Sequence, residues 1–264
     1  MINYLTGLGY PADAESLERW WSGASVEHVI GKGILRFHAV YWPAILLSAG
    51  LPLPDRIDVH EYLTVDGAKI SKSAGGAADP AALVMTYGAD ALRWWLVRDV
   101  ARAGDTDFTE SRLIARANED LANTIGNLVG RTTTLARRYA VPESVDGAGI
   151  GPAEGSERLR AARQRAPGTI ASALDDFDFR RACAAVVDLA SEANRYADTT
   201  RPWELGSSGR LAAAVAAIGE LSAVGRDLGV LLRPFTPALA ERIATALAGG
   251  APGGPVFPRV SVRH

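Results

Sequence analysis

The chain is poor in the residues that build covalent and metal cross-links. Only one of its 264 residues is a cysteine, Cys183. A single thiol cannot form a disulfide within the chain, and it excludes a zinc site built from several cysteines. We therefore expect no metal site in this chain, no zinc, and a reducing, cytoplasmic setting.

Long hydrophobic runs and a strong charge of one sign are also missing. Glycine, proline or charged residues interrupt the apolar stretches well before the roughly 20 residues that a membrane span needs. The first ten residues lack the basic start and apolar stretch of a signal peptide. The net charge is −2, which argues against a generally basic protein but is compatible with a local RNA-binding patch. We expect no membrane partner and no DNA partner.

The sequence pattern differs between the two parts of the chain. Up to about residue 108, short apolar runs alternate with proline and glycine, which is typical of part of an α/β sheet. Strands are predicted at 28–31, 57–60 and 62–65, with a hairpin turn at 66–67. A helix interrupted near Pro43 is predicted over 34–49, and another begins at Asp79-Pro80, where aspartate caps it and proline fits its first turn.

From about residue 109 the pattern becomes helical. Apolar residues recur at spacings of three and four over 117–139, 179–197 and 211–231, and a fourth helix is expected over about 156–174. Such segments favour a helical bundle. Glycine and proline predict a loop over 141–155, and they predict that the tail from 248 to 264 runs over the surface. Two domains are expected: residues 1–108, α/β, and residues 109–264, all-α with a C-terminal tail.

The strongest chemical signal is the segment Lys69-Ile70-Ser71-Lys72-Ser73, which follows the predicted turn. Two lysines three residues apart, with small hydroxyl residues between them and Gly75-Gly76 after them, predict a cationic loop able to clamp a triphosphate. Ammonium groups neutralise the charge that builds on phosphates, and hydroxyl and backbone N–H groups add hydrogen bonds. Taken alone, the five residues are equally compatible with a solvated surface loop.

This loop is not isolated, because it is similar to the KMSKS signature of class I aminoacyl-tRNA synthetases. Other segments, in the same order, resemble the methionyl members of that class: 3–10, 28–43, 50–54, 87–93, 105–108, 118–123, 126–131, 194–196 and 202–203. The resemblance spans nearly the whole chain. It implies that residues 1–108 form the C-terminal half of a Rossmann-type class I catalytic domain and that residues 109–264 form a helical anticodon-binding domain.

The resemblance also implies roles for particular residues in the first domain. In this family the KMSKS loop contacts ATP, which is taken with Mg²⁺ as substrate, and the second lysine acts in the transition state. The residues expected to bind ATP are Lys69, Ser71, Lys72 and Ser73, with Lys72 catalytic and Lys69 supporting it. The residues matching the methionine pocket are Tyr4, His38 and Trp42, with Tyr41 close by. Core packing is the plain alternative for these side chains, and we interpret His28 as structural.

In the second domain the family reads a CAU anticodon with an asparagine and an arginine one helical turn apart and a distant tryptophan. These match Asn127, Arg131 and Trp203. Residues at i and i+4 share a helix face, and both amide and guanidinium groups hydrogen-bond to the edges of unstacked bases. Trp203 offers a stacking surface next to Pro202. The plain alternatives are an ion pair for Arg131 and a helix anchor for Trp203.

The chain departs from the family pattern at several places. The HIGH-type signature and the cysteine-rich zinc knuckle do not occur in it. Gly33 stands where the family has an acidic residue, which puts amino-acid activation in doubt. The segment 74–78 replaces a Leu-Gly-Asn-Val-Val run and lacks side chains that would fix the loop.

We therefore expect a methionine–tRNA ligase family protein that activates methionine with ATP and transfers it to methionine tRNA, but is inactive without the HIGH-containing half. A separate chain could supply that half; a truncated reading frame and a free-standing paralogue are the other readings. Two different functions stay open: a non-catalytic tRNA-binding module, and a synthetase-derived enzyme of specialised metabolism that activates an amino acid for another acceptor.

Overall fold

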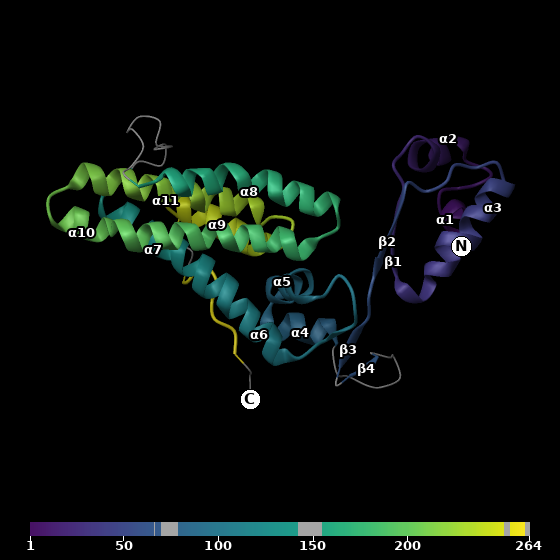
Figure 1. Ribbon diagram of the computed structural model, residues 1–264, viewed down its shortest axis with the longest axis horizontal. Helices are drawn as coiled ribbons and strands as arrows, with labels where there is room; N and C mark the ends of the chain where they lie inside the picture. Colours follow the sequence, from purple (N-terminus) through teal and green to yellow (C-terminus); the bar gives the residue numbers. More distant parts are fainter. Residues whose placement is uncertain (66, 70–78, 142–154, 251–253, 262–264) are drawn as a thin grey trace. The chain divides into compact units, whose positions relative to one another are not determined.

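The structure is a computed structural model that describes residues 1–65, 67–69, 79–141, 155–250 and 254–261. It divides into two compact units (Figure 1). The first comprises Met1–Lys69 with Ala101–Asp107, and the second comprises Ile70–Val100 with Phe108–His264.

The first unit is built around two parallel strands, β1 (Glu27–Gly31) and β2 (Arg56–His60). Short helical segments precede and connect them: α1 (Asn3–Thr6), α2 (Ala14–Leu17), η1 (Glu18–Ser22), η2 (Lys32–Ile34), η3 (Phe37–Tyr41) and α3 (Trp42–Ser48). Large apolar side chains from these helices form the core of the unit: Leu5, Trp21, Trp42 and Leu46. Gly31 and His60 are register partners, so both strands end at the same edge.

A second small sheet in this unit carries the chain toward the predicted cationic loop. Its strands β3 (Leu63–Val65), β4 (Ala68–Lys69) and β5 (Thr106–Asp107) lie in the order β4-β3-β5. The Asp107 carboxylate accepts hydrogen bonds from Thr64 Oγ1 at 2.7 Å and from the Gly67 N–H at 3.0 Å. Gly67 has φ +72°, a conformation that glycine adopts without a Cβ clash. Asp107 therefore fixes the base of the β3–β4 hairpin.

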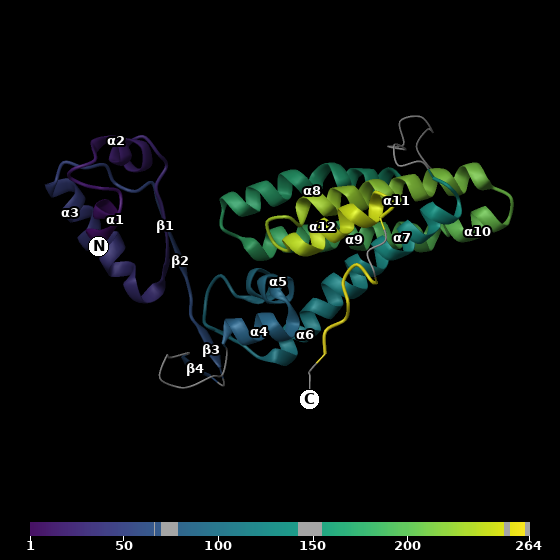
Figure 2. The same ribbon diagram turned by 180° about the vertical axis from the view of Figure 1, so that it is seen from behind.

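The second unit is helical. Its elements are α4 (Pro80–Tyr87), α5 (Ala89–Asp99), α6 (Glu110–Arg116), the wide-turn (π) segment η4 (Ala117–Gly126), α7 (Asn127–Arg138), α8 (Glu157–Asp175), α9 (Phe179–Thr200), α10 (Pro202–Ser207), α11 (Leu211–Leu231) and α12 (Pro237–Leu247). Figures 1 and 2 show α8, α9 and α11 running side by side. Alanine, valine and leucine fill their facing surfaces, which allows close helix packing.

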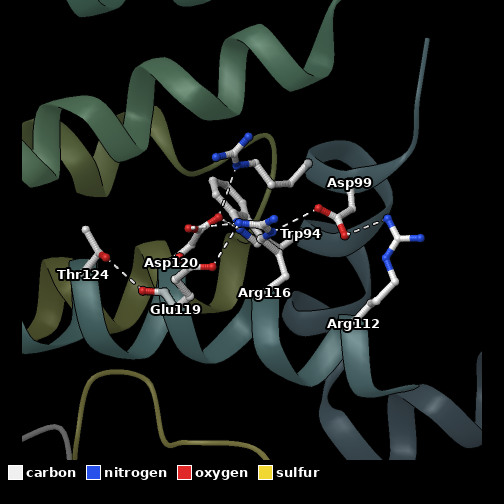
Figure 3. A network of polar contacts seen from close by, with 8 residues as sticks. Trp94, Asp99, Arg112, Arg116, Glu119, Asp120 and Thr124 are labelled. Carbon is white, nitrogen blue, oxygen red and sulfur yellow. Dashed lines mark hydrogen bonds and ion pairs between the residues drawn. The ribbon is translucent and has the colours of Figure 1, made fainter. Parts of the chain in front are cut away.

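A buried polar network joins α5 to α6 and η4 (Figure 3). Asp120, only 3% exposed, accepts hydrogen bonds from Trp94 Nε1 at 3.0 Å and Arg98 Nε at 3.2 Å. Asp99 in turn accepts from Arg116 at 3.0 Å. A buried carboxylate needs such partners, because an unpaired charge inside a protein is strongly unfavourable. The network therefore holds η4 in place directly before α7.

Most elements predicted from the sequence are confirmed, including the strands at β1 and β2 and the helices α4, α8, α9 and α11. Asp79 caps α4 by accepting from the Ala81 N–H. The helix expected over 34–49 is present as η3 and α3, with Pro43 in the first turn of α3 rather than interrupting it. Of the loop predicted over 141–155, residues 142–154 lie outside the described residues.

Two expectations differ from the structure. The predicted division at residue 108 does not coincide with the compact units, because α5 packs its buried Trp94 and Trp95 within the helical unit. The tail was expected on the surface, yet Val256 and Phe257 are buried. The tail is held by Asn118, whose side-chain amide donates to the Val260 carbonyl and accepts from its N–H. Apolar side chains and a paired backbone keep this non-helical segment against the bundle.

No helix among the described residues is both long enough and apolar enough to span a membrane.

Candidate functional site

The residues predicted to bind methionine lie together in the first unit. Tyr4, His38 and Trp42 gather with Trp21 and His28 in what we term the aromatic cluster. Ring centroids are 5.9 Å apart for Tyr4 and Trp42, and 4.8 Å apart for Tyr4 and His28. Trp42 is fully buried, whereas Tyr4 is 41% exposed. The cluster thus has an apolar floor and one side that is open to solvent.

Hydrogen bonds indicate which ring nitrogen carries the proton in the neutral form of the two histidines in the cluster. His38 Nδ1 lies 3.0 Å from the Ile34 carbonyl, which can only accept, so Nδ1 carries the proton. In the neutral ring Nε2 is then an acceptor, and Tyr4 donates its hydroxyl proton to it over 2.9 Å. Trp42 Nε1 donates to His28 Nε2 over 3.1 Å, so His28 carries its proton on Nδ1.

His28, which we interpreted as structural, is an integral part of the cluster. Burial lowers the pKa of His28 below its usual value, and the neighbouring His38 lowers it further. The ring is therefore neutral at physiological pH, and it accepts a hydrogen bond from Trp42 as a neutral ring can. Tyr41 is different, because it is 43% exposed and contacts Phe37 rather than the cluster.

Charged residues meet at the edge where β1 and β2 end. The Lys32 ammonium lies 2.6 Å from Glu61 and 2.6 Å from Asp105. The hydrogen bond to Asp105 contributes most to raising the pKa of Lys32, and the hydrogen bond to Glu61 raises it further. The hydrogen bond from Lys32 in turn lowers the pKa of Asp105. Ligands of open parallel sheets bind at the carboxyl ends of the strands, which is where these residues lie.

The predicted ATP-binding loop is described only at its start. Lys69 ends strand β4, so its backbone is placed by the hairpin that Asp107 anchors. The Lys69 side chain and the residues Ser71, Lys72 and Ser73 lie outside the described part of the chain. Their roles stay predictions.

In the second unit the structure places Arg131 beside Trp203. Arg131 lies on α7 and Trp203 on α10, and the guanidinium carbon is 5.8 Å from the centroid of the indole ring. Asn127 lies on α7 one turn before Arg131, and its side chain is exposed. Of the three residues predicted to read an anticodon, Arg131 and Trp203 are therefore adjacent in space. Asn127 lies on the same face of α7 as Arg131.

Two residues of α9 hold the Arg131 guanidinium. Nη1 donates to Asp198 Oδ1 and Nη2 donates to Asn194 Oδ1, each over 2.9 Å. The Asn194 side-chain amide also donates to the Thr124 carbonyl at 2.9 Å. Asn194 thus joins α9, η4 and α7 at one point. A guanidinium with two fixed N–H groups keeps further N–H donors for a ligand.

The short helix α10 is positioned where the Tyr139 ring lies against its backbone. A Cβ on Gly206 would lie 2.3 Å from that ring, so a larger residue would require the ring to move. The Tyr139 hydroxyl donates to the Trp203 carbonyl at 3.3 Å. Arg201, between α9 and α10, has φ +50° and ends one helix so that Pro202 can begin the next. These contacts present Trp203 next to α7.

The supporting residues are not among those predicted from the sequence. Asn194 was part of a matching segment but was given no role, and Asp198 was not singled out. A signal was present, because the two residues are four positions apart on one face of a predicted helix. Glu61, Asp107 and Tyr139 gave no comparable signal, since their partners are distant in sequence.

The comparisons with known proteins agree on one family. A family model described as tRNA synthetases class I (M) matches residues 1–133. The methionine–tRNA ligase of Thermosynechococcus vestitus is 39% identical over 250 residues, which cover 92% of this chain and 46% of that protein. The enzyme of Nostoc sp. is 38% identical over 256 residues, covering 95% and 47% respectively. The chain thus spans about half the length of the curated relatives it matches.

Solved structures give the same result. The structure of Mycobacterium tuberculosis methionyl-tRNA synthetase bound by methionyl-adenylate matches with a TM-score of 0.83 and 32% identity, covering 97% of this chain and 54% of that one. Its apo form matches with a TM-score of 0.82 and 31% identity, covering 99% and 55%. The family model covers half of the chain, and relatives of the same kind cover nearly all of it. The chain therefore belongs to the methionyl family of class I tRNA synthetases.

Proposed function

We propose that this chain acts in the ATP-dependent activation of methionine and its transfer to methionine tRNA. It supplies the carboxy-terminal part of the catalytic site and the anticodon reader. An amino-terminal part with a HIGH-type signature, on the same polypeptide or a separate one, supplies the other wall of the nucleotide site. The family membership and the methionyl-adenylate bound by the Mycobacterium tuberculosis relative support this proposal.

The surface of the first unit supports the need for an amino-terminal part. Parallel sheets are normally covered on both faces, and their strands are buried. Here Val29, in the middle of β1, is 59% exposed. Large apolar side chains on the neighbouring helices are also exposed, among them Phe37, Val40 and Leu47. An α/β half that adds strands and covers these side chains would complete the unit, so the chain alone is expected to be inactive.

In the proposed reaction, the aromatic cluster receives the methionine side chain. A polarizable thioether packs favourably against aromatic rings. The Tyr4 hydroxyl donates to His38, so the open side of the cluster presents ring surface rather than a free donor. Lys72 and Lys69 neutralise phosphate charge as adenylate forms, with Ser71 and Ser73 as supporting hydrogen-bond donors.

One observation carries the tRNA half of the proposal: Arg131 is held by Asn194 and Asp198 beside the Trp203 ring. An arginine fixed at a defined distance from an aromatic ring can hydrogen-bond to one base while the ring stacks on another. Asn127 adds an amide donor and acceptor on the same helix. This geometry favours a reader of single-stranded RNA and fits the CAU anticodon that the resemblance implies.

Methionine-dependent pyrophosphate exchange tests the catalytic part. The chain alone should show no exchange, and a protein joined to its amino-terminal part should show it. Lys72→Ala in the joined protein should lower kcat about 100- to 1000-fold with little change in the KM for methionine, because the lysine acts on transition-state charge. Robust exchange by the chain alone would contradict the division of the site. Tight tRNA binding without exchange in the joined protein would indicate a non-catalytic tRNA-binding module instead.

A further inference from the structure

The two strand ends in the first unit bring two short segments face to face. Gly31 ends β1 and is paired with His60, the last residue of β2. Lys32 and Gly33 therefore follow one strand, and Glu61 and Tyr62 follow the other. This is the edge at which open parallel sheets bind their ligands, and the β3–β4 hairpin that begins the proposed ATP loop follows directly.

Gly33 has no room for a side chain. A Cβ built on it would lie 2.1 Å from the Tyr62 hydroxyl oxygen and 3.4 Å from ring carbon Cζ. The first distance is impossible without movement, whereas the second is almost an ordinary contact. The obstruction at Gly33 is thus the hydroxyl and not the ring. At Gly31, two residues earlier, a Cβ would meet nothing closer than 3.5 Å.

Tyr62 is fixed in this place from two sides. The Asp105 carboxylate accepts the Tyr62 backbone N–H at 3.0 Å. The Lys32 ammonium lies 5.1 Å from the centroid of the Tyr62 ring. The same ammonium contacts Glu61 and Asp105 at 2.6 Å each. Lys32 is therefore held at the strand ends by two carboxylates, although the residue that follows it has no side chain.

We propose that Glu61, together with Asp105, is a carboxylate of the nucleotide-facing edge in this chain. The Tyr62 hydroxyl occupies the volume that a side chain at position 33 would need. Glu61 is a positioning residue, because it acts by holding the Lys32 ammonium at the strand ends. The acid at this edge thus comes from the segment that follows β2 and not from position 33. This inference rests on the proposed function, whereas the stability test of its steric half does not.

A thermal stability series on the full chain tests the steric half independently of activity. Gly33→Ala and Gly33→Asp should each lower Tm by roughly 2–12 °C, since overpacking destabilises. Gly31→Ala, the matched control, should stay near the wild-type Tm. Tyr62→Phe should restore most of the loss in Gly33→Asp, because it removes the obstructing oxygen. Wild-type stability of Gly33→Asp, or failure of Tyr62→Phe to restore it, would overturn the inference.

Pyrophosphate exchange in the protein joined to its amino-terminal part tests the functional half. Glu61→Gln should raise the KM for ATP about tenfold and change the KM for methionine less than twofold, whereas Glu15→Gln, an exposed carboxylate on α2, should change neither. In the Gly33→Asp/Tyr62→Phe background, Glu61→Gln should have little further effect. An unchanged KM for ATP in Glu61→Gln would overturn the inference. Absence of exchange in the wild-type joined protein would instead contradict the proposed function, and the stability series would still decide the steric half.

Discussion

Replacing Asn194 with alanine would remove the side chain that joins three helices around Arg131. The variant loses the acceptor of Arg131 Nη2 and the donor to the Thr124 carbonyl, each at 2.9 Å. A third contact, to the Ala190 carbonyl at 3.1 Å, is also lost. Hydrogen bonds to charged groups contribute about 1.5–3 kcal/mol, and a carbonyl left without its donor costs about 1–3 kcal/mol. Because the site is only partly buried, we expect a total loss of about 2–3 kcal/mol of unfolding free energy.

The remaining contact cannot compensate for this loss. Asp198 still pairs with Arg131, but its side chain is 65% exposed, and exposed ion pairs contribute about 0–1 kcal/mol. Arg131 therefore leaves its fixed place beside Trp203, and tRNA affinity should fall about tenfold, equivalent to ~1.4 kcal/mol. Urea unfolding and filter binding measure the two effects.

A double-mutant cycle decides whether Asn194 acts through Arg131. Asn194→Ala and Arg131→Ala should be clearly non-additive in tRNA binding, because the second change removes a group already displaced by the first. Gln164→Ala, which removes an exposed amide side chain on α8, serves as the control and should bind tRNA normally. Wild-type affinity and stability of Asn194→Ala would refute the reasoning, and additive effects would refute the link to Arg131.

Three further predictions follow from buried groups. Burial raises the pKa of Cys183 to about 12, so iodoacetamide at pH 8 should label the thiol only in the unfolded chain. Rapid labelling of Cys183 in the folded chain would contradict this burial. The pKa of His28 is lowered on folding, so the unfolded state binds the proton more readily. Urea unfolding should therefore show the free energy of unfolding falling as the pH drops below about 6.5. His28→Gln should reduce this pH dependence, and an equal pH dependence in both proteins would show that His28 is not its cause. Asp120→Ala leaves Trp94 and Arg98 without their buried acceptor. It should lower the free energy of unfolding by about 3 kcal/mol, and a near-wild-type value would contradict this role of Asp120.

The sequence predicts the elements that depend on local patterns. Apolar spacing of three and four gives α8, α9 and α11, and Asp79-Pro80 marks the start of α4 because a cap and a first-turn proline are local signals. The alternation of short apolar runs with glycine and proline gives β1 and β2. The family resemblance predicts that Tyr4, His38 and Trp42 belong to one pocket, and the structure places these three side chains next to one another.

Contacts between distant segments could not be predicted in the same way. Nothing local to Gly33 indicates that the Tyr62 hydroxyl fills its side-chain space, since the 28 positions between them include η3, α3 and β2. Phe257 is buried next to Gly126, where a built Cβ would make an ordinary contact with it at 3.6 Å, although 130 positions separate the two residues. The glycine and proline of the tail exclude a helix correctly but say nothing about burial.

Binding of tRNA by the chain, with and without the methionine anticodon, tests the central claim most directly. A methionine tRNA with CAU should bind more tightly than the same tRNA body with another anticodon, by about 1–3 kcal/mol for each base that is read. Trp203→Ala should weaken binding of the CAU tRNA by about 1–3 kcal/mol of lost stacking, and Arg131→Ala should also reduce the difference between the two tRNAs. Equal affinity of the wild-type chain for both tRNAs would contradict the account, because Arg131 and Trp203 would then have no anticodon to read.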